Sequence, residues 1–201
     1  MITREMIAEA VLAIGFDSLT MTKVADRLGV SHAALYSHVA DRDDLVVAAA
    51  DRAVTQMSVP DPADDWRNYL RAIAHALYEM ELNNPGLNAA LEDSDGVSEV
   101  LRVRLAEVHG ELVNLGFDAS AAFMALELVA VIASDSADRS TRLLRRSQRS
   151  RVELGEAWSE GYDDELRTLM IAATTTEPTE WFTNKLEVVL DGVGTSLAPK
   201  G

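Results

Sequence analysis

The sequence predicts an all-α fold in two domains, a small N-terminal domain over residues 1–57 and a larger helical domain over residues 58–201. Apolar residues recur every three or four positions along most of the chain, as on one face of an α-helix, and no stretch alternates as a half-buried strand does. The segment 59–62 contains two prolines. It is the predicted linker, because proline lacks the amide that a helix interior needs.

The composition limits the class of protein. With 201 residues, 48% of them hydrophobic, the chain can bury a sizeable core. It has no cysteine, so neither a disulfide nor a thiolate metal site can form. The apolar runs are shorter than a bilayer span, and the N-terminus resembles an amphipathic helix containing acids rather than a signal peptide. We therefore expect a cytoplasmic protein with no membrane partner.

The first predicted helix covers residues 3–14. Thr3 can cap its start and Gly15 can end it. Its expected inner stripe consists of Met6, Ile7, Ala10, Val11 and Ile14.

Residues 20–39 predict two short helices joined by a tight turn. Gly29 permits the left-handed backbone that ends the first helix, and Ser31 can cap the second. Apolar residues line the inner side of both helices, namely Val24, Ala25, Leu28, Leu35 and Val39. Two helices that cross steeply in this way form a helix-turn-helix, whose second helix enters the DNA major groove. The spacing alone leaves a purely structural helical corner as the alternative.

The segment 19–45, LTMTKVADRLGVSHAALYSHVADRDDL, resembles the DNA-binding domain of the TetR (tetracycline repressor) family of transcriptional regulators. The matching residues are Gly15, Thr20 with Thr22, Gly29-Val30-Ser31, Leu35-Tyr36, His38 and Arg42. The resemblance covers about residues 3–57. Beyond them it implies only an all-helical ligand-binding and dimerisation domain.

The resemblance implies a set of DNA-contacting side chains. Those implied to face base edges are Thr22, His32, Ala33 and Ser37, and those implied to face phosphate are Lys23, Tyr36, His38 and Arg42. Hydrogen-bonding and methyl groups can discriminate bases, whereas phosphate contacts position the protein without reading sequence. His38 has an alternative role as a core histidine, and Lys23 as a solvated charge.

The net charge of −15 is unevenly distributed: residues 1–57 carry −3 and the rest −12. Most of the acidity therefore lies outside the expected reading surface, where it would limit non-specific DNA binding. The reading surface is itself poor in basic residues. We expect modest affinity per half-site and dependence on dimerisation.

Further helices are predicted on periodicity and capping signals. Their ranges are 41–57, 65–82, a short segment 87–91, 97–115, 119–133, 163–174 and 180–197. In the TetR family the helix equivalent to 41–57 acts as a lever between ligand and DNA. The helix at 97–115 is expected to bury Leu101, Leu105, Val108, Leu112 and Leu115.

The predicted helix 119–133 is apolar nearly all round and must be buried on more than one side. A second copy of the chain is the simplest cover. In the TetR family a late pair of helices forms a four-helix bundle with the partner, and this helix with the last one fits that description. We therefore predict a homodimer.

The resemblance implies a small-molecule effector bound in the second domain. Candidate contacts are Trp66, Tyr69, His75, Tyr78, Met80, His109, Phe123, Met124, Glu127 and Trp158. Each has a plain core or surface role as its alternative. Glu127 is singled out because an acid within an apolar helix needs a partner, which an arginine from 139–151 could provide.

The segment 139–151 contains six arginines. One interpretation is a second anion site. The other is a solvated loop or helix start balanced by the acids that follow it.

The leading hypothesis is a ligand-responsive repressor that binds a palindromic DNA operator as a homodimer. The alternative is an all-helical dimeric protein-interaction module. An enzyme is not expected, since the sequence has no HExxH, no phosphate-binding glycine loop, no G-x-S-x-G and no cysteine nucleophile. Neither a metal nor another cofactor is expected.

Overall fold

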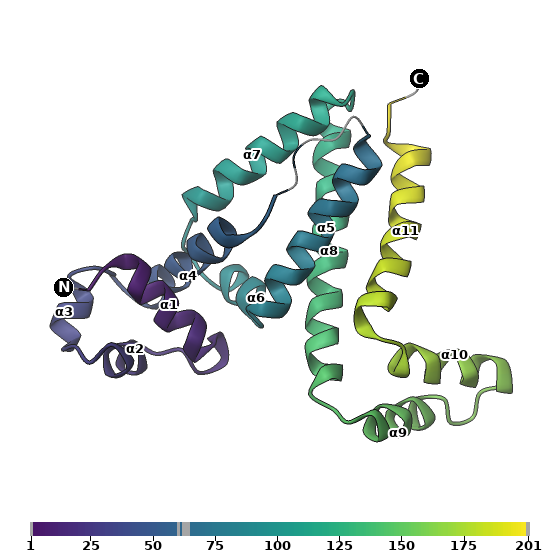
Figure 1. Ribbon diagram of the computed structural model, residues 1–201, viewed down its shortest axis with the longest axis horizontal. Helices are drawn as coiled ribbons and strands as arrows, with labels where there is room; N and C mark the ends of the chain where they lie inside the picture. The colour runs from purple at the N-terminus through teal and green to yellow at the C-terminus, as the bar shows by residue number, and fades with distance from the viewer. Residues whose placement is uncertain (1, 60, 62–64, 200–201) are drawn as a thin grey trace.

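A computed structural model describes residues 2–59, 61 and 65–199, and these are all-α with no strand, as predicted. An N-terminal group of helices leads into a C-terminal group in which α5, α8 and α11 stand side by side (Figure 1). The elements are α1 Arg4–Ile14, the 3-10 turn η1 Phe16–Ser18, α2 Met21–Leu28, α3 His32–Tyr36, α4 Arg42–Gln56, α5 Trp66–Asn83, α6 Leu87–Glu92, α7 Glu99–Asn114, α8 Ala119–Leu144, α9 Gln148–Trp158, α10 Asp164–Thr175 and α11 Pro178–Ser196.

Side-chain caps fix the starts of the first four helices. Each cap accepts a hydrogen bond from the amide three residues further on, and the caps are Thr3, Thr20, Ser31 and Asp41. Replacing such a cap with alanine typically costs about 1 kcal/mol. The predicted linker lies partly outside the described residues, which omit Pro60 and Pro62.

The N-terminal hydrophobic core joins α1 to α4 and also takes in α6. Its fully buried members include Ile7, Val24, Leu35 and Leu45. Leu87 of α6 belongs to the same cluster, so α6 packs into this core although it follows α5 in sequence. Met6, expected inside, lies on the solvent side of α1, because α1 buries Ala8 with Ile7 and Val11 against α4.

The second core lies between α5, α8 and α11, with α5 packed most extensively against α8. The end of α7 closes it through Val108 and Leu112. Leu101 and Leu105 were expected to be buried but are exposed. The physical reason is the placement of α7, because its N-terminal half packs against α4 and not against α5, α8 and α11.

Helix α8 is longer than predicted and ends at Leu144, because Ala137, Ser140 and Leu143 continue its buried side past residue 133. Among the described residues it is the one helix long and apolar enough to cross a membrane by length and composition. It packs against α5 and α11 as their common neighbour. Length and composition alone do not distinguish a core helix from a membrane span.

The arginine-rich segment is mostly helical: it ends α8 and continues into α9. Gly155 allows α9 to approach α10 closely, because a Cβ there would lie 2.8 Å from the Ile171 Cα. Arg151 is buried rather than solvated, while Arg149 forms an exposed ion pair of 3.0 Å with Glu153. The interpretation as a helix start balanced by acids holds for Arg149 at the beginning of α9, whereas a loop through most of the segment was wrong.

Candidate nucleic-acid interface

The α2–α3 corner is held by its turn and by two buried side chains. Gly29 adopts φ +65°, a left-handed conformation that favours glycine. The amide of Val30 then donates to the Ala25 carbonyl at 3.0 Å. Ala25 and Leu35 are fully buried beneath the turn, so the opposite side of α3 faces solvent.

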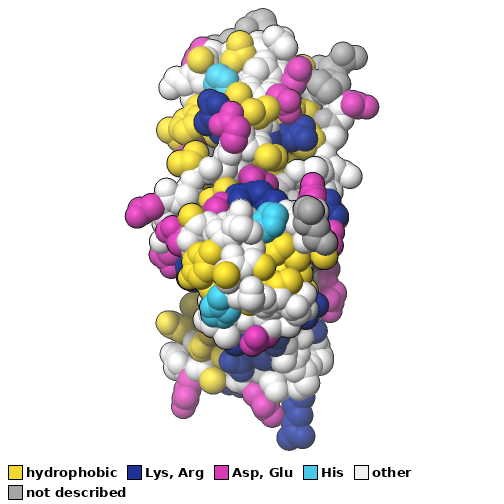
Figure 2. Space-filling model, turned by 90° about the vertical axis from the view of Figure 1, so that its left-hand side faces the viewer, with side chains coloured by type: hydrophobic (Ala, Val, Ile, Leu, Met, Phe, Trp, Pro, Cys, Tyr) yellow, Lys and Arg dark blue, Asp and Glu magenta, His cyan; other side chains and the backbone are white. Residues whose placement is uncertain are grey.

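The side chains predicted to contact DNA lie mostly on this solvent side. Those that are exposed are Thr22, Lys23, His32, Ala33, Tyr36, Ser37 and Arg42, while His38 is half-buried. Tyr36 has 52% of its surface exposed, which is high for a tyrosine beside a small core. Figure 2 views the molecule from the end where α2 and α3 lie in Figure 1, and this end presents histidine, basic, acidic and apolar side chains together.

Two of these residues have local hydrogen bonds that limit their roles. The Ser37 hydroxyl donates to the Ala34 carbonyl at 2.6 Å, so its oxygen remains available only as an acceptor. Arg42 lies 4.0 Å from Asp43 in a loose, exposed ion pair. A phosphate group could replace that partner at little cost, since exposed pairs contribute little.

Arg4 was not predicted as part of this region. Its guanidinium pairs with Asp44 at 2.5 Å and donates to the His38 carbonyl at 3.5 Å, so it ties α1 to both the end of α3 and the start of α4. The hydrogen bond from Arg4 is the main cause that lowers the pKa of Asp44. Asp44 also accepts from the Ala40 amide at 3.0 Å. Only the tertiary fold brings these residues together.

Helix α4 carries the contacts between the two domains. The Ser98 hydroxyl, at the start of α7, donates to Asp51 of α4 at 2.6 Å. Gly96 packs so closely on α4 that a Cβ there would lie 2.4 Å from Val47 Cγ2. A displacement of α7 or its preceding loop would therefore be transmitted to α4, which leads into the α2–α3 corner.

The residues predicted as effector contacts are not gathered into one cavity. Tyr78 stacks on Phe182 with ring centres 4.2 Å apart and donates to Ser140 at 2.9 Å, and His75 meets the edge of Phe182. Trp66 packs edge-on against Phe117, and Tyr69 is buried in the same core.

The other candidates lie elsewhere. The ring Nε2 of His109 is 2.9 Å from the Ala119 carbonyl, and Trp158 stacks beneath the Arg139 guanidinium at 5.7 Å. Phe123, Met124 and Glu127 lie exposed on α8. Glu127 therefore has solvent around it, and none of the described residues forms an ion pair with it.

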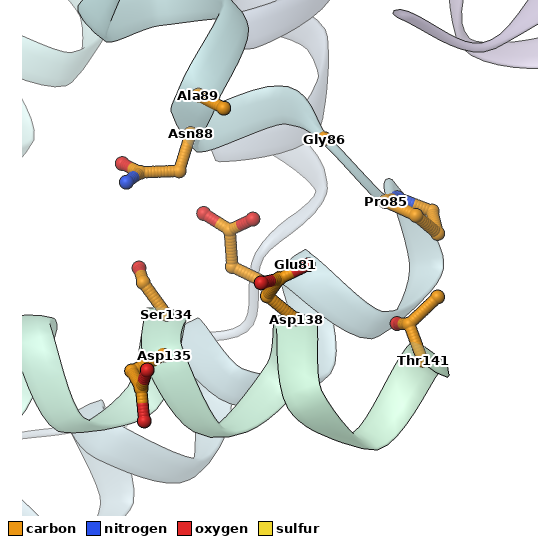
Figure 3. Close-up of a pocket in the computed structure, with 9 residues that line it drawn as sticks. All are labelled: Glu81, Pro85, Gly86, Asn88, Ala89, Ser134, Asp135, Asp138 and Thr141. Atoms are coloured by element: carbon orange, nitrogen blue, oxygen red, sulfur yellow. The ribbon is translucent and has the colours of Figure 1, made fainter. Parts of the chain in front are cut away.

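Two hollows border the α5–α6 region. One, of about 380 Å³, lies between the end of α4 and α5 and includes Met80. The other, of about 190 Å³, lies between α5, α6 and α8 around Glu81 (Figure 3). Burial is the main cause that raises the pKa of Glu81 to about 7.

Sequence reasoning missed Glu81, although a signal existed. The residue follows Tyr78 by three positions and Leu77 by four, so it continues the buried stripe of α5.

No group of three or more histidine or acidic side chains in the described part of the chain is arranged to hold a metal ion.

The corner, the exposed α3 and the helical second domain together define a helix-turn-helix protein. Residues 7–49 match the sequence model described as "Bacterial regulatory proteins, tetR family". The N-terminal domain is therefore similar to the DNA-binding domain of TetR-family regulators.

Curated relatives agree over the same region. The class A tetracycline repressor protein from transposon 1721 of Escherichia coli is 42% identical over 60 residues, which is 28% of each chain. An HTH-type transcriptional repressor of Mycobacterium tuberculosis (strain CDC 1551 / Oshkosh) is 32% identical over 77 residues, 37% of this chain and 30% of the relative. The match thus spans less than a third of these relatives' length.

Solved structures share the fold over nearly the whole chain. The TetR family protein ActR of Streptomyces coelicolor, in complex with actinorhodin, superposes with a TM-score of 0.81 at 21% identity over 98% of this chain and 97% of that one. A TetR variant from Acinetobacter baumannii, in complex with minocycline, gives 0.71 at 20% identity over 97% and 98%.

Proposed function

We propose that the protein is a transcriptional repressor that reads DNA with α3 and is controlled by a small molecule bound in its second domain. The observation that carries this proposal is the exposed α3 surface on a buried, capped helix-turn-helix corner. Tyr36 and His32 project from it while Leu35 holds the helix to the core. The family match over residues 7–49 supports the same assignment.

The repressor is proposed to act as a homodimer on a palindromic operator. Its exposed apolar side chains include Val188 on α11, 72% exposed, and Val131 on α8, 64% exposed. A second copy that covers α8 and α11 would bury these side chains. Two α3 helices related by a two-fold axis would then read half-sites about one DNA turn apart. The residues proposed to contact DNA are the eight predicted from sequence.

An effector would act by preferring one arrangement of the two domains. The structures of ActR with actinorhodin and of the A. baumannii TetR variant with minocycline have the same fold with a small molecule bound. A ligand can shift the population only by its differential affinity for the two arrangements. The contacts of α4 with α6 and α7 supply a route by which that preference would reach α3. We expect this regulator to work in the cytoplasm.

Binding of His32→Ala to DNA tests the proposal. His32 is exposed, so its loss should leave folding intact. With genomic duplex fragments as probe, the variant should lose affinity for the preferred fragments and keep the salt-sensitive affinity for bulk DNA, since base contacts specify and phosphate contacts position. Tyr162→Ala, which alters an exposed residue between α9 and α10, is the matched control. Equal loss on all fragments would refute base reading by His32.

A further inference from the structure

The hollow around Glu81 is an acidic crevice between three helices. Glu81 enters from α5, Asn88 from α6, and Ser134, Asp135, Asp138 and Thr141 from α8. None of its lining residues is lysine or arginine. Its volume of about 190 Å³ suits a small organic molecule rather than a drug-sized one.

Glu81 points its carboxylate into this crevice, toward Asn88 and Ser134 (Figure 3). Only 9% of the residue's surface is exposed. No ion pair reaches the carboxylate from the described residues. Its polar neighbours are neutral donors, the Asn88 backbone amide and the Ser134 hydroxyl. A buried charge without a charged partner is costly. The raised pKa of Glu81, with burial as its main cause, expresses that cost.

The surrounding charges deepen the negative potential. Glu92 on α6 and Asp138 on α8 both raise the pKa of Glu81 further, whereas the Asn88 amide and the Ser134 hydroxyl lower it. The nearby cations pair with residues other than Glu81. Arg142 pairs with Asp138 at 2.6 Å on the surface, and the Lys185 ammonium donates to Ser136 at 2.7 Å.

We propose that this crevice binds a small organic cation, with Glu81 as its counter-ion and the Ser134 hydroxyl oxygen as a second acceptor. An ammonium group can donate to both the carboxylate and the hydroxyl oxygen. A bare metal ion is a poorer occupant, because no three acidic side chains in the described residues converge closely enough to coordinate one. A cation would supply the counter-ion that Glu81 lacks among the described residues.

The crevice also adjoins the DNA-binding domain. One side of α6 lines it through Asn88 and Ala89, and the other side packs Leu87 and Ala90 into the N-terminal core. A cation that draws α6 toward α8 would therefore shift the support of α4. This regulatory consequence rests on the proposed function, whereas the cation site itself does not.

The test is calorimetric titration of the full-length protein with ethylammonium, benzylammonium and 2-phenylethylammonium. Benzyl alcohol serves as the neutral counterpart of benzylammonium. At least one ammonium compound should bind and benzyl alcohol should not. Glu81→Gln should weaken the binding by about tenfold or more, the effect of losing one charge-assisted hydrogen bond. Glu79→Gln, an equal charge change on the exposed side of α5, should not.

Two further arms separate binding from folding. Ser134→Leu, which fills the crevice and leaves Glu81 in place, should also block binding. Wild-type affinity should fall below a pH of about 7, where Glu81 takes up a proton, and this pH dependence should be absent in Glu81→Gln. Circular dichroism checks that each variant is folded.

The outcomes are distinguishable. No binding by any ammonium compound, equal binding of benzyl alcohol, or unchanged affinity in Glu81→Gln would overturn the cation site. Glu81-dependent binding that leaves DNA affinity unchanged would uphold the site and overturn its link to α4. Glu81-dependent binding by a protein that has no sequence preference for DNA would uphold the site while refuting the proposed function.

Discussion

The Ser98 hydroxyl donates a 2.6 Å hydrogen bond to the Asp51 carboxylate and joins the start of α7 to α4. The same oxygen accepts from the Leu101 amide at 2.9 Å and so caps α7. One side chain thus begins a helix of the second domain and attaches it to the first. This double role makes Ser98 a position where the coupling between domains can be measured.

Ser98→Ala should lower the free energy of unfolding by about 2 kcal/mol, since it removes both a helix cap and a hydrogen bond to a charged group. Asp51→Asn keeps the cap and weakens only the interdomain hydrogen bond, so this variant should lose less unfolding free energy than Ser98→Ala. Urea unfolding of both variants gives the comparison. Ser120→Ala, at an exposed position near the start of α8, is the control. Equal losses in Ser98→Ala and Asp51→Asn would show that the cap contributes nothing.

Tyr36→Ala should weaken operator binding by about tenfold or more, because a hydrogen bond to a charged phosphate is among the stronger kind. Its thermal unfolding should be unchanged, because the tyrosine is largely exposed. Fluorescence anisotropy and circular dichroism measure the two properties. Tyr162→Ala should affect neither. A lowered unfolding temperature in Tyr36→Ala would mean that the side chain belongs to the core.

Arg4→Gln should flatten the acid side of the stability profile. The pKa of Asp44 is lowered in the folded protein, chiefly by its hydrogen bond with Arg4. The ion pair therefore stabilises the fold at pH values above the ordinary pKa of Asp44. This stabilisation is lost as the pH falls through the lowered pKa of Asp44 in the folded protein. The pair is largely exposed, so the difference should stay below about 1 kcal/mol. Urea unfolding from pH 7 to 3 tests this, with the exposed Arg27→Gln as control, and parallel profiles of wild type and Arg4→Gln would contradict it.

Glu81→Gln should stabilise the protein at pH 8 and not at pH 4. The folded pKa of about 7 lies above the ordinary value of 4.5, so wild-type stability falls as pH rises between them. The full difference corresponds to about 3 kcal/mol. Urea unfolding at the two pH values measures it, and Glu79→Gln is the control. A variant less stable than wild type at pH 8 would show that the carboxylate is well paired.

Val188→Glu should convert the dimer into a monomer, because it places a charge on the apolar surface of α11 that the partner is proposed to cover. Sedimentation velocity at micromolar concentration measures the change. Val97→Glu is the matched control, since Val97 is similarly exposed, at 76%, but precedes α7. If Val97→Glu dissociated the dimer and Val188→Glu did not, the dimer interface would lie near the start of α7 and not on α11.

Local signals in the sequence were sufficient for most of the helices and for the turn between α2 and α3, but not for α9. The caps at Thr20 and Ser31 and the turn at Gly29 act within a few residues, so they could be identified without a tertiary fold. The end of α8 could not be identified in this way. Its last three turns are polar on one side, and they are helical because the opposite side packs against the rest of the protein.

The second domain was harder to predict for a related reason. An aromatic residue at a helical spacing predicts burial but not whether it meets a ligand or another ring, and Tyr78 meets Phe182. The role of Arg4 depends on its ion pair with Asp44, which lies 40 residues away in the sequence. Glu81 could be recognised in the sequence as an acid on the buried side of a helix. The sequence does not show that residues of α6 and α8 surround it.

The central claim is that paired α3 helices read a specific DNA sequence. Selection of bound sequences from a random duplex pool, at two salt concentrations, tests it most directly. We predict recovery of a palindrome at both salts, with half-sites about one helical turn apart, and no such enrichment with Tyr36→Ala. Recovery of unrelated sequences that are lost at the higher salt would contradict the claim, because phosphate neutralisation alone would then account for binding.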